Sequence, residues 1–178
     1  MSRLSRDRAE FAEFVAARSP ALQRAAYLMV GDVQHAQDLV QEALTKTYVA
    51  WPRLADLGHA EAYTRKAITT TAISWFRRRS WHERTVDRLP DRPVTDHAAA
   101  VVDHGAVWEA LLELPVRQRT AIVLRYYEDL TEPQTAEAMG CAVGTVKSQV
   151  SSGMAKLRAL LGDDPDLLPS LDHVVVTR

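Results

Sequence analysis

The C-terminal half of the chain contains the sequence feature that most constrains its fold. This feature is a glycine-containing turn followed by a long helical pattern. The stretch is "MGCAVGTVKSQVSSGMAKLRALLG", and its apolar residues recur at steps of three and four, the spacing of one face of an α-helix. These residues are Val146, Val150, Met154, Leu157 and Leu161. No acidic residue occurs between Ala138 and Gly162, so the other face carries short polar groups and positive charge. Such a face suits a negatively charged partner.

The residues before this helix predict a shorter helix that ends in a sharp reversal. Thr131 and Gln134 have the spacing of a capping box, and Pro133 lies in the first turn, where its missing N–H does no harm. Ala136 is small enough for two helices to cross closely, and Gly140 stands where a left-handed backbone is needed. This is the pattern of a helix-turn-helix, whose second helix enters the DNA major groove. A plain helical hairpin within a bundle has the same spacing and is the alternative.

Helical patterns cover nearly all of the remaining chain, so the predicted fold class is all-α. Ser19 and Pro20 predict the N-cap and first position of a second helix, Asp32 caps a third, and Pro52 stops it. Residues 60–79 are rich in β-branched side chains, which makes a strand conceivable, but their length without turn residues favours a helix. The predicted helices span 5–17, 20–31, 33–51, 60–79, 106–113, 116–128, 132–139 and 143–161.

The helical pattern stops between residues 85 and 104, where prolines, charges and a short alanine run occur. Twenty extended residues could span roughly 65 Å, about two turns of B-DNA. We therefore expect two small helical domains, residues 1–84 and 105–162, joined by a flexible linker at 85–104. An acidic C-terminal tail, 163–178, is expected to be loose.

Composition excludes several classes of function. The 178 residues carry a net charge of −1, one cysteine and six scattered histidines without metal-ligand spacing. No apolar run is long enough to cross a membrane, and residues 1–11 lack the apolar core of a secretory signal, so we expect a cytoplasmic protein without membrane insertion. No nucleophile–base pair and no phosphate-binding glycine loop is present. We expect no enzyme activity, no cofactor and no metal.

The stretch "YTRKAITTTAISWFRRRSWHER", residues 63–84, interleaves aromatic with basic side chains. Aromatic faces can stack on unpaired bases at roughly 1–3 kcal/mol each, while arginines follow the phosphates. This pairing suits single-stranded DNA. The alternative is that Trp75 or Phe76 belongs to the core, whereas the triple arginine at 77–79 cannot.

Residues 114–161 closely resemble region 4 of bacterial RNA polymerase sigma factors of the extracytoplasmic-function group, in particular the SigE-like subfamily of the sigma-70 family. The matching residues are Leu114-Pro115, Gln118-Arg119, Leu124-Arg125-Tyr126, Glu128-Asp129-Leu130, Ala136, Gly140 and Gly144-Thr145-Val146-Lys147-Ser148. The resemblance implies that this domain reads the minus-thirty-five element of a promoter. By position, the residues facing the DNA would be Thr145, Lys147, Ser148, Gln149, Ser151 and Ser152.

Two residues depart from that pattern. Ala142 stands where relatives usually have a capping Ser, and an uncapped helix start costs about 1 kcal/mol. Ser152 stands where relatives usually carry Arg, which removes one contact to DNA.

The stretch "AQDLVQEAL" resembles the segment of sigma region 2 that docks on the clamp helices of the polymerase β′ subunit. The implied interface residues are Asp38, Gln41 and Glu42, with Leu39 partly shared with the core. The alternative is the solvated face of a core helix.

Residues 63–84 resemble sigma regions 2.3 and 2.4, which hold the minus-ten element and capture a flipped base. Extracting a base costs a few kcal/mol, which stacking and charge can offset. Thr70 stands where many relatives have Asn. The implied minus-ten residues are Thr70, Ser74, Trp75, Arg77, Arg78 and Arg79.

These observations lead to the hypothesis of a sigma factor that binds core RNA polymerase, through the β′ clamp helices and the β subunit, and directs promoter-specific transcription initiation. Its other partners would be promoter DNA and, as the resemblance allows, an anti-sigma factor. The alternatives are a stand-alone helix-turn-helix regulator that binds DNA without polymerase and a helical interaction module without a DNA role. The small net charge favours dependence on polymerase, because autonomous DNA binders are normally more cationic.

Overall fold

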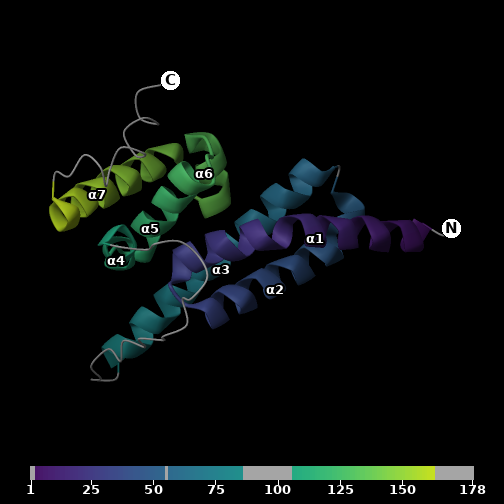
Figure 1. The fold of residues 1–178 in the computed structure, drawn as a ribbon, viewed down its shortest axis with the longest axis horizontal. Coiled ribbons are helices and arrows are strands. Elements are labelled where there is room, and N and C mark those ends of the chain that lie inside the picture. Colours follow the sequence, from purple (N-terminus) through teal and green to yellow (C-terminus); the bar gives the residue numbers. More distant parts are fainter. Residues whose placement is uncertain (1–2, 55, 86–105, 163–178) are drawn as a thin grey trace.

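The computed structural model describes residues 3–54, 56–85 and 106–162, with side chains for 7–54, 56–78 and 106–162. Within these ranges the chain is helical apart from short turns, which confirms the all-α prediction (Figure 1). The predicted tail, and the predicted linker apart from Thr85, lie outside the described residues. The helices are α1 (Arg3–Val30), α2 (Val33–Ala50), α3 (Leu57–Thr85), α4 (Ala106–Leu112), α5 (Val116–Ile122), α6 (Glu132–Met139) and α7 (Val143–Leu161), with a 3₁₀ turn η1 (Trp51–Arg53) and a π-helical turn η2 (Val123–Tyr127).

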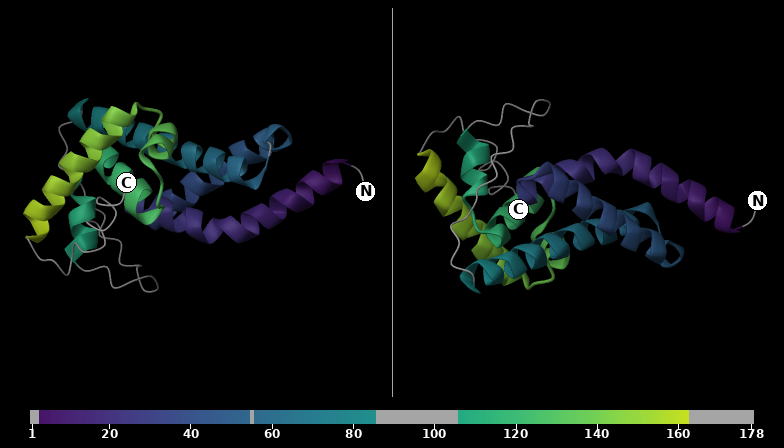
Figure 2. Two further views of the ribbon diagram at one scale, coloured as in Figure 1. Left: turned by 90° about the horizontal axis from the view of Figure 1, so that it is seen from above. Right: turned by 90° about the horizontal axis from the view of Figure 1, so that it is seen from below.

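Helix α1 is continuous, so the predicted boundary at Ser19 is wrong. Pro20 lies inside the helix, where proline lacks a hydrogen-bond donor and crowds the preceding turn. Phe14 on one side of it and Leu22 on the other are each only 4% exposed. Phe14 packs against the Trp51 ring, with ring centres 5.4 Å apart, and Leu22 lies in an apolar cluster further along the helix. Burial on both sides of Pro20 keeps the two segments in one helix, which is curved but unbroken (Figure 2).

The start of α2 and the helical state of α3 agree with the predictions. The Asp32 carboxylate caps α2 by accepting a hydrogen bond from the His35 backbone N–H at 2.7 Å. In α3, the hydroxyls of Thr64 and Thr70 donate to backbone carbonyls four residues earlier, at 2.7 Å each. These two hydroxyls are therefore satisfied within the helix.

The helix-turn-helix predicted from the sequence is present as α6 and α7. Thr131 and Gln134 form the reciprocal capping box at the start of α6. Gly140 ends α6 in the left-handed conformation, with φ of 63°. Helix α7 begins after Ala142, which provides no side-chain cap, as expected from its methyl group.

Helices α1, α2 and α3 form an elongated bundle, called here the N-terminal bundle, and α4–α7 form the C-terminal bundle at one end of it (Figure 1). One apolar cluster runs through both bundles, from Met29 and Ile68 to Leu124 and Val146. A second cluster, which includes Leu114, Met154 and Leu157, lies within the C-terminal bundle. In the part of the chain that the structure describes, no helix is both long enough and apolar enough to cross a membrane.

Candidate nucleic-acid interface

The residues predicted to face duplex DNA lie together along α7. Val146 is fully buried and Leu157 is 1% exposed, so the opposite side of the helix is turned to solvent. The exposed members of the predicted set are Lys147, Ser148, Ser151 and Ser152, and Thr145 and Gln149 are half-buried. The helix therefore presents one short polar surface, which we call the α7 surface.

Lys147 carries the positive charge of the α7 surface and forms a weak ion pair with Glu132. The ammonium of Lys147 lies 3.5 Å from the Glu132 carboxylate, and the two side chains are 62% and 39% exposed. An ion pair this exposed contributes little to stability. Lys147 can therefore exchange Glu132 for a phosphate at small cost.

The residues predicted to hold the minus-ten element lie in the second half of α3. Thr70, Arg77 and Arg78 are exposed, Ser74 and Trp75 are half-buried, and the side chain of Arg79 lies outside the described residues. The hydroxyl of Thr70 is already engaged with the Lys66 carbonyl oxygen at 2.7 Å.

The two neighbouring aromatic residues on α3 have different surroundings. Trp75 lies between the His35 ring, 4.5 Å away, and the Phe76 ring, 4.7 Å away, measured between ring centres. Phe76 packs against the shared apolar cluster, as the core alternative anticipated for one of the pair. Both rings are half-buried, and Phe76 is the one packed on that cluster.

The predicted polymerase-binding residues divide between surface and core of α2. Asp38, Gln41 and Glu42 are exposed, whereas Leu39 is 7% exposed and belongs to the apolar cluster. Lys46, for which no role was predicted, lies 2.6 Å from the Glu42 carboxylate and 3.5 Å from the Thr71 hydroxyl. It links the exposed face of α2 to the helix that carries the predicted minus-ten residues.

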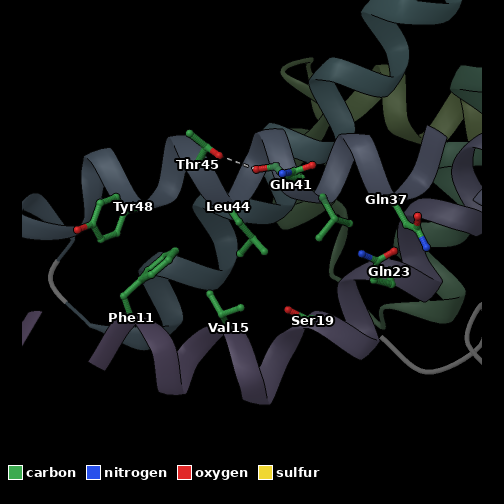
Figure 3. A pocket seen from close by; sticks show the side chains of 10 residues that line it. Phe11, Val15, Ser19, Gln23, Gln37, Gln41, Leu44, Thr45 and Tyr48 are labelled. Carbon is green, nitrogen blue, oxygen red and sulfur yellow. Dashed lines mark hydrogen bonds between the residues drawn. The ribbon is translucent and has the colours of Figure 1, made fainter. Parts of the chain in front are cut away.

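A groove of about 570 Å³ lies between α1 and α2, next to the predicted polymerase-binding face (Figure 3). Its apolar part includes Phe11, Leu44 and Tyr48, and its polar part includes Gln41. In the described residues, no group of His, Cys, Asp and Glu side chains could hold a metal ion.

Arg119 makes buried contacts that no local sequence pattern predicts. Its side chain is buried, and the residue is 4% exposed. Burial lowers the pKa of its guanidinium to about 10. An arginine within the apolar run "RTAIVL" was the available signal, although nothing local shows what it contacts.

Comparison with known proteins matches two separate regions of this chain to protein families. The family described as "Sigma-70 region 2" matches residues 14–82, and that described as "Sigma-70, region 4" matches residues 104–157. The RNA polymerase sigma-E factor of Streptomyces avermitilis is 39% identical over 149 residues, covering 84% of this chain and 83% of the relative. That of Streptomyces coelicolor is 38% identical, covering 84% of each.

Solved structures also match. The sigma factor RpoE of Bartonella quintana, crystallised with the anti-sigma factor NepR, has a TM-score of 0.70 at 27% identity and covers 87% of this chain and 98% of that chain. CnrH, solved in complex with the cytosolic domain of CnrY, has a TM-score of 0.60 at 22% identity and shares the fold.

Two helical bundles, a helix-turn-helix and both regional matches define the class: the chain belongs to the sigma-70 family of RNA polymerase sigma factors. Within that family it is similar to the sigma-E factors of Streptomyces, and so to the extracytoplasmic-function group.

Proposed function

We infer that this chain binds core RNA polymerase and directs promoter-specific transcription initiation. The observation that carries this conclusion is the presence of both sigma-70 regions on one chain, with 39% identity to a sigma-E factor over 84% of the chain. The structure adds a complete helix-turn-helix whose second helix is free of acidic residues.

We assign three tasks to three surfaces. The exposed face of α2, with Asp38, Gln41 and Glu42, would dock on the β′ clamp helices. The second half of α3, with Trp75 and the arginines from residue 77, would hold the separated strand of the minus-ten element. The α7 surface would read the minus-thirty-five element as duplex. Exposure of most of these side chains supports the assignment.

Polymerase is expected to supply most of the affinity for DNA. The chain has a net charge of −1, whereas proteins that bind DNA on their own normally carry more positive charge. Once α2 is anchored on polymerase, the effective concentration of the other two surfaces near the promoter rises. Because the proposed partners are core RNA polymerase and promoter DNA, the proposed location is the cytoplasm. An anti-sigma factor is a further proposed partner, because the similar RpoE structure contains one.

Run-off transcription with core polymerase and a library of promoter fragments tests the function directly. We expect the wild-type chain to yield specific transcripts that core polymerase alone does not. We expect the double variant Arg77→Ala, Arg78→Ala to lose most of this activity, because both side chains are exposed on the proposed single-strand surface.

A matched control is the double variant Arg53→Ala, Arg117→Ala, which removes the same charge from exposed positions outside the proposed surfaces. It should transcribe like the wild type. A gel shift with and without core polymerase completes the test. Strong specific binding by the free protein, together with no polymerase-dependent transcription, would replace this proposal with a stand-alone regulator.

A further inference from the structure

The first residue of α6 brings a negative charge to the α7 surface. This residue is Glu132, and its carboxylate lies 3.5 Å from the ammonium of Lys147. Helix α7 contains no acidic residue between its own bounds, and its charged side chains are Lys147, Lys156 and Arg158. The helix that would read the minus-thirty-five element therefore receives its acidic partner from the other helix of the helix-turn-helix.

The packing of the two helices places Glu132 next to Lys147. The reciprocal capping box fixes the first turn of α6, where Glu132 lies. Ala136, one turn further along α6, is 5% exposed, and Val146, directly before Lys147, is fully buried. Both belong to the same apolar cluster. The carboxylate and the ammonium are thus held near each other by the core beneath them, whether or not they form an ion pair.

The ion pair itself is loose. Its distance of 3.5 Å is longer than the roughly 2.7–2.9 Å of a charge-assisted hydrogen bond from nitrogen to oxygen. Both side chains are also in contact with solvent, where ion pairs contribute little to stability. One alternative is that Glu132 serves only the helix, because a negative charge in the first turn is favourable. That alternative gives Glu132 no effect on DNA binding.

The docking geometry of a helix-turn-helix gives the position of Glu132 a second meaning. The second helix lies in the major groove, and the first helix crosses the phosphate backbone beside it. The start of α6 and the first half of α7 would therefore both meet the edge of the groove, where the phosphates run. An ammonium binds a phosphate oxygen as it binds a carboxylate oxygen, because both are charged acceptors. Glu132 lies beside Lys147 on the side from which a phosphate would approach.

We propose that Glu132 takes the place of a promoter phosphate in the DNA-free protein, and that the phosphate displaces it from Lys147 when the α7 surface meets DNA. The proposal rests on the proposed function. Phosphate contacts supply affinity that does not depend on sequence. By occupying Lys147, Glu132 lowers the affinity for any duplex and leaves the base contacts of α7 unchanged. The residue thus limits binding to random DNA and increases the dependence on polymerase.

Removal of this one charge tests the proposal in the full-length chain assembled with core polymerase. The variants are Glu132→Gln, Lys147→Gln and the combination of the two, which together form a double-mutant cycle. Glu137→Gln is the matched control, because Glu137 is exposed on α6 but lies five residues further on, at a different side of the helix.

Two labelled DNA fragments serve as probes. One is a promoter fragment that the wild type transcribes, and the other is the same fragment with its minus-thirty-five bases scrambled. Fluorescence anisotropy at several salt concentrations measures the affinity of each variant for both fragments. Circular dichroism confirms that the variants remain folded, as the exposure of both side chains leads us to expect.

We expect Glu132→Gln to raise the affinity for both fragments by the same several-fold factor at low salt. The gain should shrink as salt rises, because salt screens exposed charges. It should also be much smaller when Lys147 is already replaced by glutamine, since no ammonium remains to be released. Glu137→Gln should bind like the wild type.

Three results would overturn the proposal while leaving the sigma-factor assignment intact. The first is unchanged or weaker binding by Glu132→Gln. The second is an equal gain with and without Lys147, which would show that Glu132 acts by general repulsion of DNA. The third is a gain confined to the fragment with intact minus-thirty-five bases, which would make Glu132 a base-reading residue. A wild-type chain that transcribes no promoter would overturn the assignment and this proposal together.

Discussion

The guanidinium of Arg119 lies at the C-terminal end of α1, with its Nε 2.8 Å from the Met29 backbone oxygen. The last carbonyls of a helix have no partner within the helix and carry partial negative charge, so a cation there is favourable. The same guanidinium also satisfies the Leu112 backbone oxygen. A residue 90 positions away in sequence thus completes the end of the first helix.

Replacement of Arg119 by alanine should lower the free energy of unfolding by about 3 kcal/mol, because two carbonyl oxygens lose their donor and a buried side chain leaves a cavity. Arg119→Lys should recover part of the loss, since one ammonium lacks the planar fork that donates in two directions. Urea denaturation followed by circular dichroism measures both. Equal stability of Arg119→Ala and the wild type would show that the carbonyls find other partners.

The pKa of Arg119 determines how the stability difference between the wild type and Arg119→Ala depends on pH. Burial lowers the pKa of Arg119 to about 10, below its ordinary value. Above pH 10 the unfolded chain therefore holds this proton more tightly than the folded chain, and the group makes stability rise with pH in that window. Between about pH 5 and pH 8 the guanidinium is charged in both states. The difference between wild type and Arg119→Ala should be constant there, and a slope would point to another titrating group.

Ala142→Ser should stabilise the protein by about 1 kcal/mol, or raise its melting temperature by about 2–4 °C. Ala142 is the N-cap of α7 and already has the extended backbone of a cap, with φ of −74° and ψ of 152°. A serine hydroxyl at that position can accept from the backbone N–H of Gly144 or Thr145 in the first turn. Ala155→Ser, which adds the same hydroxyl at an exposed position inside α7 and away from the cap, is the control. An unchanged or lower melting temperature for Ala142→Ser would refute the prediction.

Two buried threonines on α3 should respond in opposite directions to replacement by valine. Among the described residues the Thr69 hydroxyl has no hydrogen-bond partner, so Thr69→Val should stabilise by about 1 kcal/mol. The Thr64 hydroxyl bonds the Thr47 hydroxyl at 2.8 Å and the Ala60 carbonyl at 2.7 Å. Thr64→Val should therefore destabilise by about 1–3 kcal/mol. Thermal unfolding of the two variants measures both changes in stability. Two changes of the same sign would contradict the prediction.

Local signals were enough to predict helix ends and the recognition helix, but not the contacts between distant helices. Asp32 and Gly140 act within a few residues, through a cap and a left-handed turn, and both are confirmed. Pro20 gave an equally clear local signal for a helix start, yet burial on both sides of it outweighed that signal. The hydrogen bond from Arg119 to the Met29 backbone oxygen depends on how the two bundles pack. The spacing of apolar residues within a helix does not indicate such packing. The exposed side of α7 was predictable because the spacing of its apolar residues fixes which side is buried.

Gly153→Ala should destabilise the protein by about 1–2 kcal/mol despite the better helix propensity of alanine. A methyl group at Gly153 would lie 2.7 Å from the Ile122 Cδ1 and 3.3 Å from the Gln118 Cβ, where α7 crosses α5. Gly144 on the same helix has open space around it, so Gly144→Ala is the matched control. It should be neutral or stabilising by up to about 1 kcal/mol. If both glycines respond alike in urea denaturation, the crossing is looser than the structure indicates.

Lys147→Gln should weaken binding of polymerase holoenzyme to a minus-thirty-five duplex in a salt-dependent manner. Lys147 is exposed on the α7 surface, and its only described ion pair is the weak one with Glu132. If it neutralises one phosphate, its loss should reduce the slope of log affinity against log salt by about 1. Fluorescence anisotropy at several salt concentrations measures the slope. Lys156→Gln removes the same charge from the same helix, nine residues and so half a turn away in angle, and should leave the slope unchanged. Equal slopes for Lys147→Gln and Lys156→Gln would mean that a different face of α7 meets the DNA.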